Sequence, residues 1–143
     1  ANSVAGYLIT EADTVVIDLG TATTFDVVSK NKEYLGGSIA PGIKISLDAL
    51  TLKTASLKSV ELDTPNKVIG KNTYEAIQSG LIMGHASMID SMVEKIILEI
   101  DIEPKIILTG GLSKVVQPIL NVNVEYIENL TLVGLEEIFK LNN

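Results

Sequence analysis

Cysteine is absent from the 143 residues, and His85 is the single histidine. Without cysteine the chain has neither a disulfide framework nor a thiolate nucleophile, and one histidine excludes a histidine-rich metal site. The absence of cysteine is compatible with a reducing cytoplasm, which is the expected location of the protein.

Long apolar runs and basic residues are also scarce. The apolar stretches at 14–19 and 106–108 are far shorter than the roughly twenty residues that span a bilayer. Lysine and arginine number 11 against 18 acidic residues, and the formal net charge is −7. The short apolar runs predict no membrane segment. Because so acidic a chain repels a phosphate backbone, we also expect no direct contact with nucleic acid.

Apolar residues make up 46% of the chain, enough to fill the core of one compact domain. Ala1 stands where an initiator methionine is expected, and residues 1–8 read as the middle of a small-residue helix rather than a signal peptide. We therefore expect the chain to begin inside a longer protein.

Runs of β-branched residues dominate the first third of the chain. The β-branched runs at 14–19 and 23–28 are separated only by Gly20, Thr21 and Ala22, and turn residues at 29–32 then precede a third segment, 33–40. This spacing predicts an antiparallel meander of three strands. Val15, Val16 and Ile17 are apolar in succession, which is typical of a strand covered on both faces.

The remaining pattern alternates helices with strands and favours a mixed sheet with helices packed on it. We expect helices at 43–53 and 72–100, a short helix capped by Ser113 and ending near Pro118, a helix at 132–141, strands at 105–109 and 122–127, and a long ordered loop at 54–71. In the long helix, Asn72 or Thr73 is the expected cap. Gly80 and Gly84 either admit a second backbone or mark a break between two helices.

The segment that follows the first strand carries the strongest chemical signal. Asp18 ends a buried strand, and Gly20, Thr21 and Thr24 follow it. Backbone N–H groups and hydroxyls in such a turn can approach a phosphate, while Asp18 can hold a cation. The segment lacks Walker spacing, so an ordinary hairpin explains it equally well.

A second glycine turn, at 108–113, follows a strand and opens a helix, and its glycines allow close approach to a flat ligand or a phosphate. A helix-entry turn without any ligand is the more common meaning of this pattern. For His85, which lies among apolar helix residues, a packed or surface role is favoured over that of a catalytic base.

Five segments taken together resemble the type III pantothenate kinases. They are Asp-Leu-Gly-Thr-Ala-Thr-Thr at 18–24, Gly-Gly-Ser-Ile-Ala-Pro-Gly at 36–42, Ile-Gly-Lys-Asn-Thr at 69–73, Ala-Ile-Gln-Ser-Gly at 76–80 and Thr-Gly-Gly-Leu at 109–112. Each segment alone has an ordinary structural explanation. Their order and spacing over nearly the whole chain carry the resemblance.

The resemblance implies an α/β fold: an actin-like ATPase (ribonuclease H-like) domain, with a mixed sheet that contains the three-strand antiparallel meander and flanking helices. It implies that residues 1–143 are the C-terminal domain of a kinase whose N-terminal domain is absent from this chain. The implied activity is ATP-dependent phosphorylation of pantothenate to 4'-phosphopantothenate, the first step of coenzyme A biosynthesis, by a cytoplasmic homodimer.

The resemblance also assigns site residues. Asp18 matches the residue that binds a monovalent cation, K⁺ or NH₄⁺, beside the phosphates of ATP. The other implied cofactor is Mg²⁺. Thr73 matches the threonine that contacts pantothenate. The nucleotide contacts implied are those of Gly20, Thr21, Gly110 and Gly111.

Two family motifs are missing from this chain: an N-terminal Asp-x-Gly-Asn-Thr phosphate loop, and a Gly-x-Asp-Arg motif whose aspartate is the proposed base. That aspartate would lie before residue 1, so we assign no catalytic residue within the chain. Because phosphoryl transfer needs ATP, metal and acceptor positioned together, we expect the chain alone to be inactive.

Two other functions remain open. Relatives with these motifs have been labelled Bvg accessory factors, which suggests a transcriptional regulator that acts through a partner rather than by direct DNA binding. The third hypothesis is a non-catalytic oligomerisation domain, with Gly80, Gly84 and the Met83, Met88 and Met92 stripe as a dimer face. An intramolecular core stripe explains the methionines at least as well.

Overall fold

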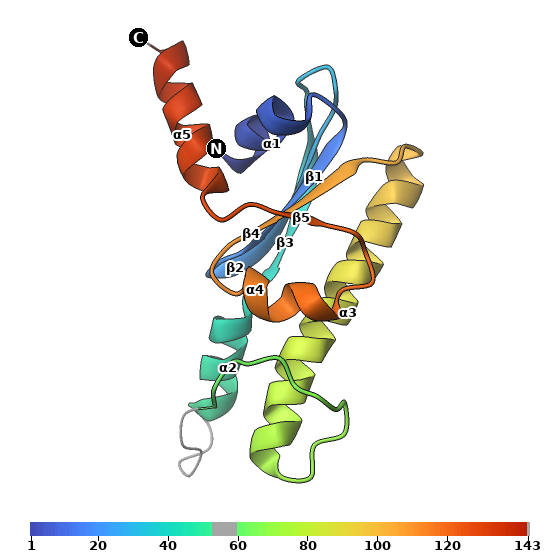
Figure 1. The fold of residues 1–143 in the computed structure, drawn as a ribbon, viewed down its shortest axis with the longest axis vertical. Helices are drawn as coiled ribbons and strands as arrows, with labels where there is room; N and C mark the ends of the chain where they lie inside the picture. Colours follow the sequence, from blue (N-terminus) through green and yellow to red (C-terminus); the bar gives the residue numbers. More distant parts are fainter. Residues whose placement is uncertain (53–59, 143) are drawn as a thin grey trace.

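The computed structural model describes residues 1–52 and 60–142, and their strands form one mixed five-stranded sheet in the order β3-β2-β1-β4-β5 (Figure 1). The antiparallel part comprises β1 (Thr14–Leu19), β2 (Ala22–Val28) and β3 (Tyr34–Pro41). Parallel to β1 run β4 (Lys105–Thr109) and then β5 (Glu125–Tyr126). The expected meander and the mixed sheet are both confirmed.

Helices cover both faces of this sheet (Figure 1). On one side lies α1 (Asn2–Thr10), with α5 (Leu130–Leu141) packed against it. On the other side lies the long α3 (Thr73–Ile100), whose first half extends beyond the sheet beside α2 (Ile43–Thr51). The short α4 (Ser113–Val116) and a 3-10 turn, η1 (Gln117–Ile119), connect β4 to β5.

The core has two parts because β1 is covered on both faces. Val15 and Ile17 point into the larger cluster, where they join Ile89 and other apolar residues of α3. Val16 points the other way, into a smaller cluster with Ala5 of α1. All five side chains are buried, so the unbroken apolar run in β1 is explained as expected.

The long helix α3 is capped at its N-terminus. The Asn72 side chain accepts a hydrogen bond from the Glu75 N–H at 2.9 Å, and the Glu75 carboxylate accepts one from the Lys71 N–H at 2.7 Å. Asn72 is therefore the cap. The helix runs unbroken through Gly80 and Gly84, so the alternative of a break there is wrong.

The apolar residues of α3 that pack on the larger core begin at Leu81 and continue to Ile100. Met88 and Met92 pack against the larger core, which places these two methionines in the intramolecular stripe. Gly80 and Gly84 are exposed, and a Cβ built on either would meet no atom within 4 Å.

Several element boundaries differ from the expected ones. Ser113 is wrong as a cap, because the helix begins at Ser113 itself after Leu112, and the Ser113 hydroxyl is buried without a cap bond. The last strand is shorter than 122–127, because Val122 and Val124 pack on the core instead of pairing in the sheet. The last helix begins at Leu130 rather than 132.

The expected loop at 54–71 lies partly outside the described residues, and 60–71 has no helix or strand. The helix expected at the start of the chain is present as α1. Among the described residues, no helix is long and apolar enough to cross a membrane.

Candidate functional site

Three turns converge at one end of the sheet. The turn that joins β1 to β2 lies against the start of α2, where the Gly42 N–H donates to the Thr21 carbonyl at 3.2 Å. On its other side Gly110 packs on Leu19. Because β1 and β4 are parallel and Asp18 pairs with Thr109, both turns lie at carboxyl ends of neighbouring strands. Ligands of open α/β sheets bind at such ends.

The two glycines of the turn after β4 have different roles. Gly110 has φ +102°, and an added Cβ would lie 2.6 Å from backbone atoms of Leu19, so close packing explains this glycine. Gly111 is exposed, and a Cβ there would meet nothing within 4 Å. Gly20 and Thr21 are exposed as well. Gly110 thus packs the turn after β4 against the end of β1. Gly20, Thr21 and Gly111 form an exposed border, called the open edge below.

Asp18 is half-buried at the end of β1 and points to the side of the sheet that carries α1. Its Oδ2 accepts a hydrogen bond from the Asn2 side-chain amide at 2.7 Å. Its Oδ1 faces the β1–β2 turn, since a Cβ on Gly20 would lie 3.4 Å from that atom. One carboxylate oxygen is therefore held, and the other lies beside the candidate phosphate loop.

A hollow of about 500 Å³ lies in front of Asp18, and residues that line it include Asn2, Thr24, Asp26 and Tyr34. The Tyr34 hydroxyl donates to Asp26 Oδ1 at 2.9 Å, and this bond raises the pKa of Tyr34. Carboxylate, hydroxyl and amide oxygens are the ligands that hard cations prefer. The Asp18 and Asp26 carboxylates and the Thr24 hydroxyl therefore offer oxygens that fit a hard cation, whereas the Asn2 amide oxygen accepts from Thr131. The described residues hold no group of three or more His, Cys, Asp or Glu suited to a metal.

Thr73 lies elsewhere, in the first turn of α3, which Figure 1 shows beyond the sheet. It lines a hollow of about 650 Å³ together with Lys71, Ala76 and Gly80. The structure therefore separates Thr73 from Asp18 and from the three converging turns.

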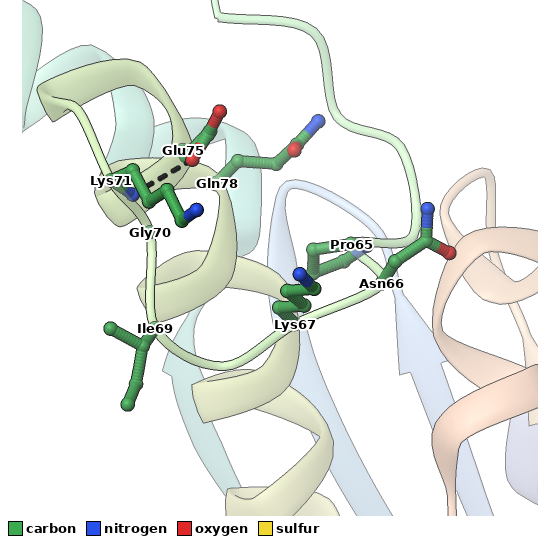
Figure 2. A pocket seen from close by; sticks show the side chains of 8 residues that line it. All are labelled: Pro65, Asn66, Lys67, Ile69, Gly70, Lys71, Glu75 and Gln78. Carbon is green, nitrogen blue, oxygen red and sulfur yellow. Dashed lines mark hydrogen bonds between the residues drawn. The ribbon is translucent and has the colours of Figure 1, made fainter.

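A neighbouring hollow of about 360 Å³ shares Gly70 and Lys71 with that of Thr73. Figure 2 shows Lys67 and Lys71 on the loop that borders it, with the Lys71–Glu75 hydrogen bond dashed. Two cationic side chains thus lie close to the start of α3.

His85 is a packed histidine, as expected. Its Nε2 lies 2.6 Å from the hydroxyl of Thr23, which is buried, and partial burial lowers the pKa of His85. Thr23 points toward α3, whereas its neighbour Thr24, the partner of Asp18, points to the opposite face. His85 is therefore separated from Asp18 by the sheet.

The sequence reasoning missed Asn2, which contacts Asp18 across 16 residues and Thr131 across 129 residues of chain. No local pattern marks such a residue, because its partners become neighbours only in the fold.

Comparisons with known proteins identify the family of the chain. Residues 1–95 match the sequence profile of the type III pantothenate kinases. The chain is 44% identical over 99% of its length to the type III pantothenate kinase of Anaeromyxobacter sp. strain K, and 45% identical over 99% of its length to that of Syntrophus aciditrophicus strain SB. Each match covers 56% of the relative, so the chain spans about half the length of the curated relatives it matches.

Solved structures share the fold. A Campylobacter jejuni protein, named as a conserved putative Baf family transcriptional activator, superposes with TM-score 0.66 and 25% identity, over 96% of this chain and 62% of that chain. The Alp12 filament structure superposes with TM-score 0.65 and 14% identity, over 99% of this chain and 51% of that chain. The fold is that of an actin-like ATPase domain. By sequence, the chain belongs to the type III pantothenate kinase family.

Proposed function

We propose that the protein containing this chain is a kinase that transfers the γ-phosphoryl group of ATP to pantothenate, the first step of coenzyme A biosynthesis. The observation that carries the proposal is the open edge of Gly20, Thr21 and Gly111 at the carboxyl ends of β1 and β4. It lies in a chain 44% identical to a type III pantothenate kinase. Phosphoryl transfer depends mainly on positioning and electrostatic stabilisation, which such an edge can supply.

On the nucleotide side, the Thr21 hydroxyl and the backbone N–H groups of Thr21 and Gly111 bind the phosphates, whereas the Gly20 N–H donates to the Ala22 carbonyl at 3.1 Å. Gly110 supports this edge from behind by packing on Leu19. Bound Mg²⁺ and a monovalent cation, K⁺ or NH₄⁺, supply positive charge that offsets the charge of the phosphates. Asp18 would hold the monovalent cation, because its Oδ1 faces the turn.

On the acceptor side, the Thr73 hydroxyl binds pantothenate. Lys67 and Lys71 border the adjoining hollows, and their charge favours the pantothenate carboxylate. Thr73 lies in the first turn of α3 and Thr21 in the turn between β1 and β2, and further parts of the kinase are needed to place the acceptor in line with ATP. Residues 1–143 act as the C-terminal domain, and the N-terminal domain and a second copy in a homodimer complete the site.

The catalytic base comes from the part of the kinase that precedes residue 1. The net charge of −7 disfavours direct binding to nucleic acid. We place the kinase in the cytoplasm.

Matched threonine variants of the full-length kinase test the two substrate assignments. Thr73→Val should raise the KM for pantothenate by about 2–10-fold, the value of one hydrogen bond, and leave the KM for ATP unchanged. Thr21→Val should raise the KM for ATP by a similar factor and leave the KM for pantothenate unchanged. Thr51→Val is the control, because the Thr51 hydroxyl bonds carbonyls of its own helix. Wild-type KM values for both substrates in both variants would contradict the assignments.

A regulatory function is the second candidate, favoured by the similarity to the Campylobacter jejuni protein, which is named as a transcriptional activator. The net charge argues that such an effect would run through metabolism or a protein partner. Fluorescence anisotropy with duplex DNA at rising salt distinguishes the two. We expect no salt-dependent binding; tight binding that weakens with salt would reveal direct DNA contact.

A further inference from the structure

Asn2 connects three elements through its side-chain amide. Its Nδ2 donates to Asp18 Oδ2 on β1 at 2.7 Å, and its Oδ1 accepts from the Thr131 hydroxyl on α5 at 2.7 Å. An ionised carboxylate only accepts hydrogen bonds, so the amide nitrogen must face Asp18. Thr131 then fixes the other end of the amide.

This chain of hydrogen bonds determines which way the Asp18 carboxylate faces. The terminal torsion of an aspartate is broad, so a free carboxylate turns its oxygens readily. With Oδ2 held by Asn2, Oδ1 stays beside the β1–β2 turn, as the 3.4 Å approach to a Cβ on Gly20 shows. Asn2 therefore presents one oxygen of Asp18 toward the candidate phosphate loop.

The position of Thr131 is itself determined by close packing of α5 on α1. Leu130, its neighbour, is fully buried in the smaller core. Gly134, one turn further along α5, packs so closely on the backbone of Ala1 that a Cβ would clash with the Ala1 carbonyl. The contact holds α5 at the start of α1, within reach of Asn2.

We propose that Asn2 is a positioning residue for Asp18 and that Thr131 orients Asn2, so that α5 helps to set the affinity of the cation site. The inference rests on the proposed function, in which Asp18 binds a monovalent cation beside ATP. Because Asn2 acts through Asp18, its loss changes the response to potassium and leaves pantothenate binding unchanged.

The test uses the full-length kinase with potassium as the probe. Two readouts are taken: the potassium concentration for half-maximal phosphorylation, and the potassium-dependent rise in Tm without turnover. Asn2→Ala should raise the half-maximal potassium concentration about tenfold, the effect of losing one charged hydrogen bond, with the KM for pantothenate unchanged. Thr131→Val should raise it about threefold, and Thr131→Ser should restore the wild-type value. Asn123→Ala, on an exposed residue before β5, is the matched control.

The outcomes separate the inference from the function on which it rests. If wild type and Asn2→Ala respond alike to potassium, while Asp18→Asn does not respond, Asn2 is a structural tether and the inference is overturned. A lower Tm of Asn2→Ala in the absence of potassium would not change that conclusion. If wild type shows no potassium response in either readout, the cation role of Asp18 fails and the inference fails with it.

Discussion

Replacing Gly110 with alanine should destabilise the chain through two costs that the geometry identifies. Gly110 has φ +102°, a conformation that costs an L-residue about 1–2 kcal/mol. The new Cβ would also lie 2.6 Å from backbone atoms of Leu19, and overpacking of this kind costs about 1–3 kcal/mol. Together these predict a loss of about 2–5 kcal/mol from an unfolding free energy that for most domains is about 5–15 kcal/mol.

Gly111→Ala is the matched control, since a Cβ there meets no atom within 4 Å and its φ is not positive. We expect its unfolding free energy to stay within about 0.5 kcal/mol of wild type. Urea unfolding of the two variants and wild type measures the difference. Equal stability of Gly110→Ala and Gly111→Ala would refute the packing argument. In the full-length kinase, Gly111→Ala should instead weaken ATP binding, because Gly111 borders the open edge.

Three further predictions concern the core, a helix cap and pH. Ile89→Ala, at a fully buried site, should cost about 2–5 kcal/mol in urea unfolding, while Leu98→Ala, 78% exposed, should cost under about 0.5 kcal/mol. Asn72→Ala should cost about 1 kcal/mol and fray the start of α3, measured by amide exchange. Burial lowers the pKa of His85, so the unfolded chain binds the proton first. The stability of wild type relative to His85→Gln should be full above pH 6.5 and fall below it; a pH-independent difference would disprove this.

Local patterns predicted the helices and strands well where turn-forming residues mark their ends. The strands at 14–19 and 105–109 have the expected bounds, because a carboxylate with glycine or a glycine pair follows the apolar run. The strand at 122–127 was overestimated for a physical reason. Its alternating apolar residues, Val122 and Val124, are packed against the core by a loop, and periodicity does not distinguish such burial from pairing in a sheet.

The candidate site was predictable in part. The pairing of β1 with β4 brings Gly110 against Leu19, next to the turn that holds Gly20 and Thr21. The sequence could not show that Gly110 serves packing while Gly111 is open, because that distinction depends on contact with Leu19, far away in the chain.

Contacts between side chains far apart in the chain could not be predicted from the sequence either. Thr23 meets His85 across 62 residues, and Asn2 meets Thr131 across 129 residues. Spacing rules describe neighbours within one helix or one strand. Polar partners of this kind therefore emerge only when the sheet and its two helical layers are assembled.

The assignment of this chain to a pantothenate kinase is tested most directly by one activity measurement. ATP-dependent phosphorylation of pantothenate, with potassium and magnesium present, is measured for the chain alone, for the full-length protein and for the chain mixed with a separately made N-terminal half. We predict turnover by the full-length protein and by the mixture, and none by the chain alone. If the full-length protein does not phosphorylate pantothenate, the kinase function is contradicted. Turnover by the chain alone would contradict the requirement for a second domain.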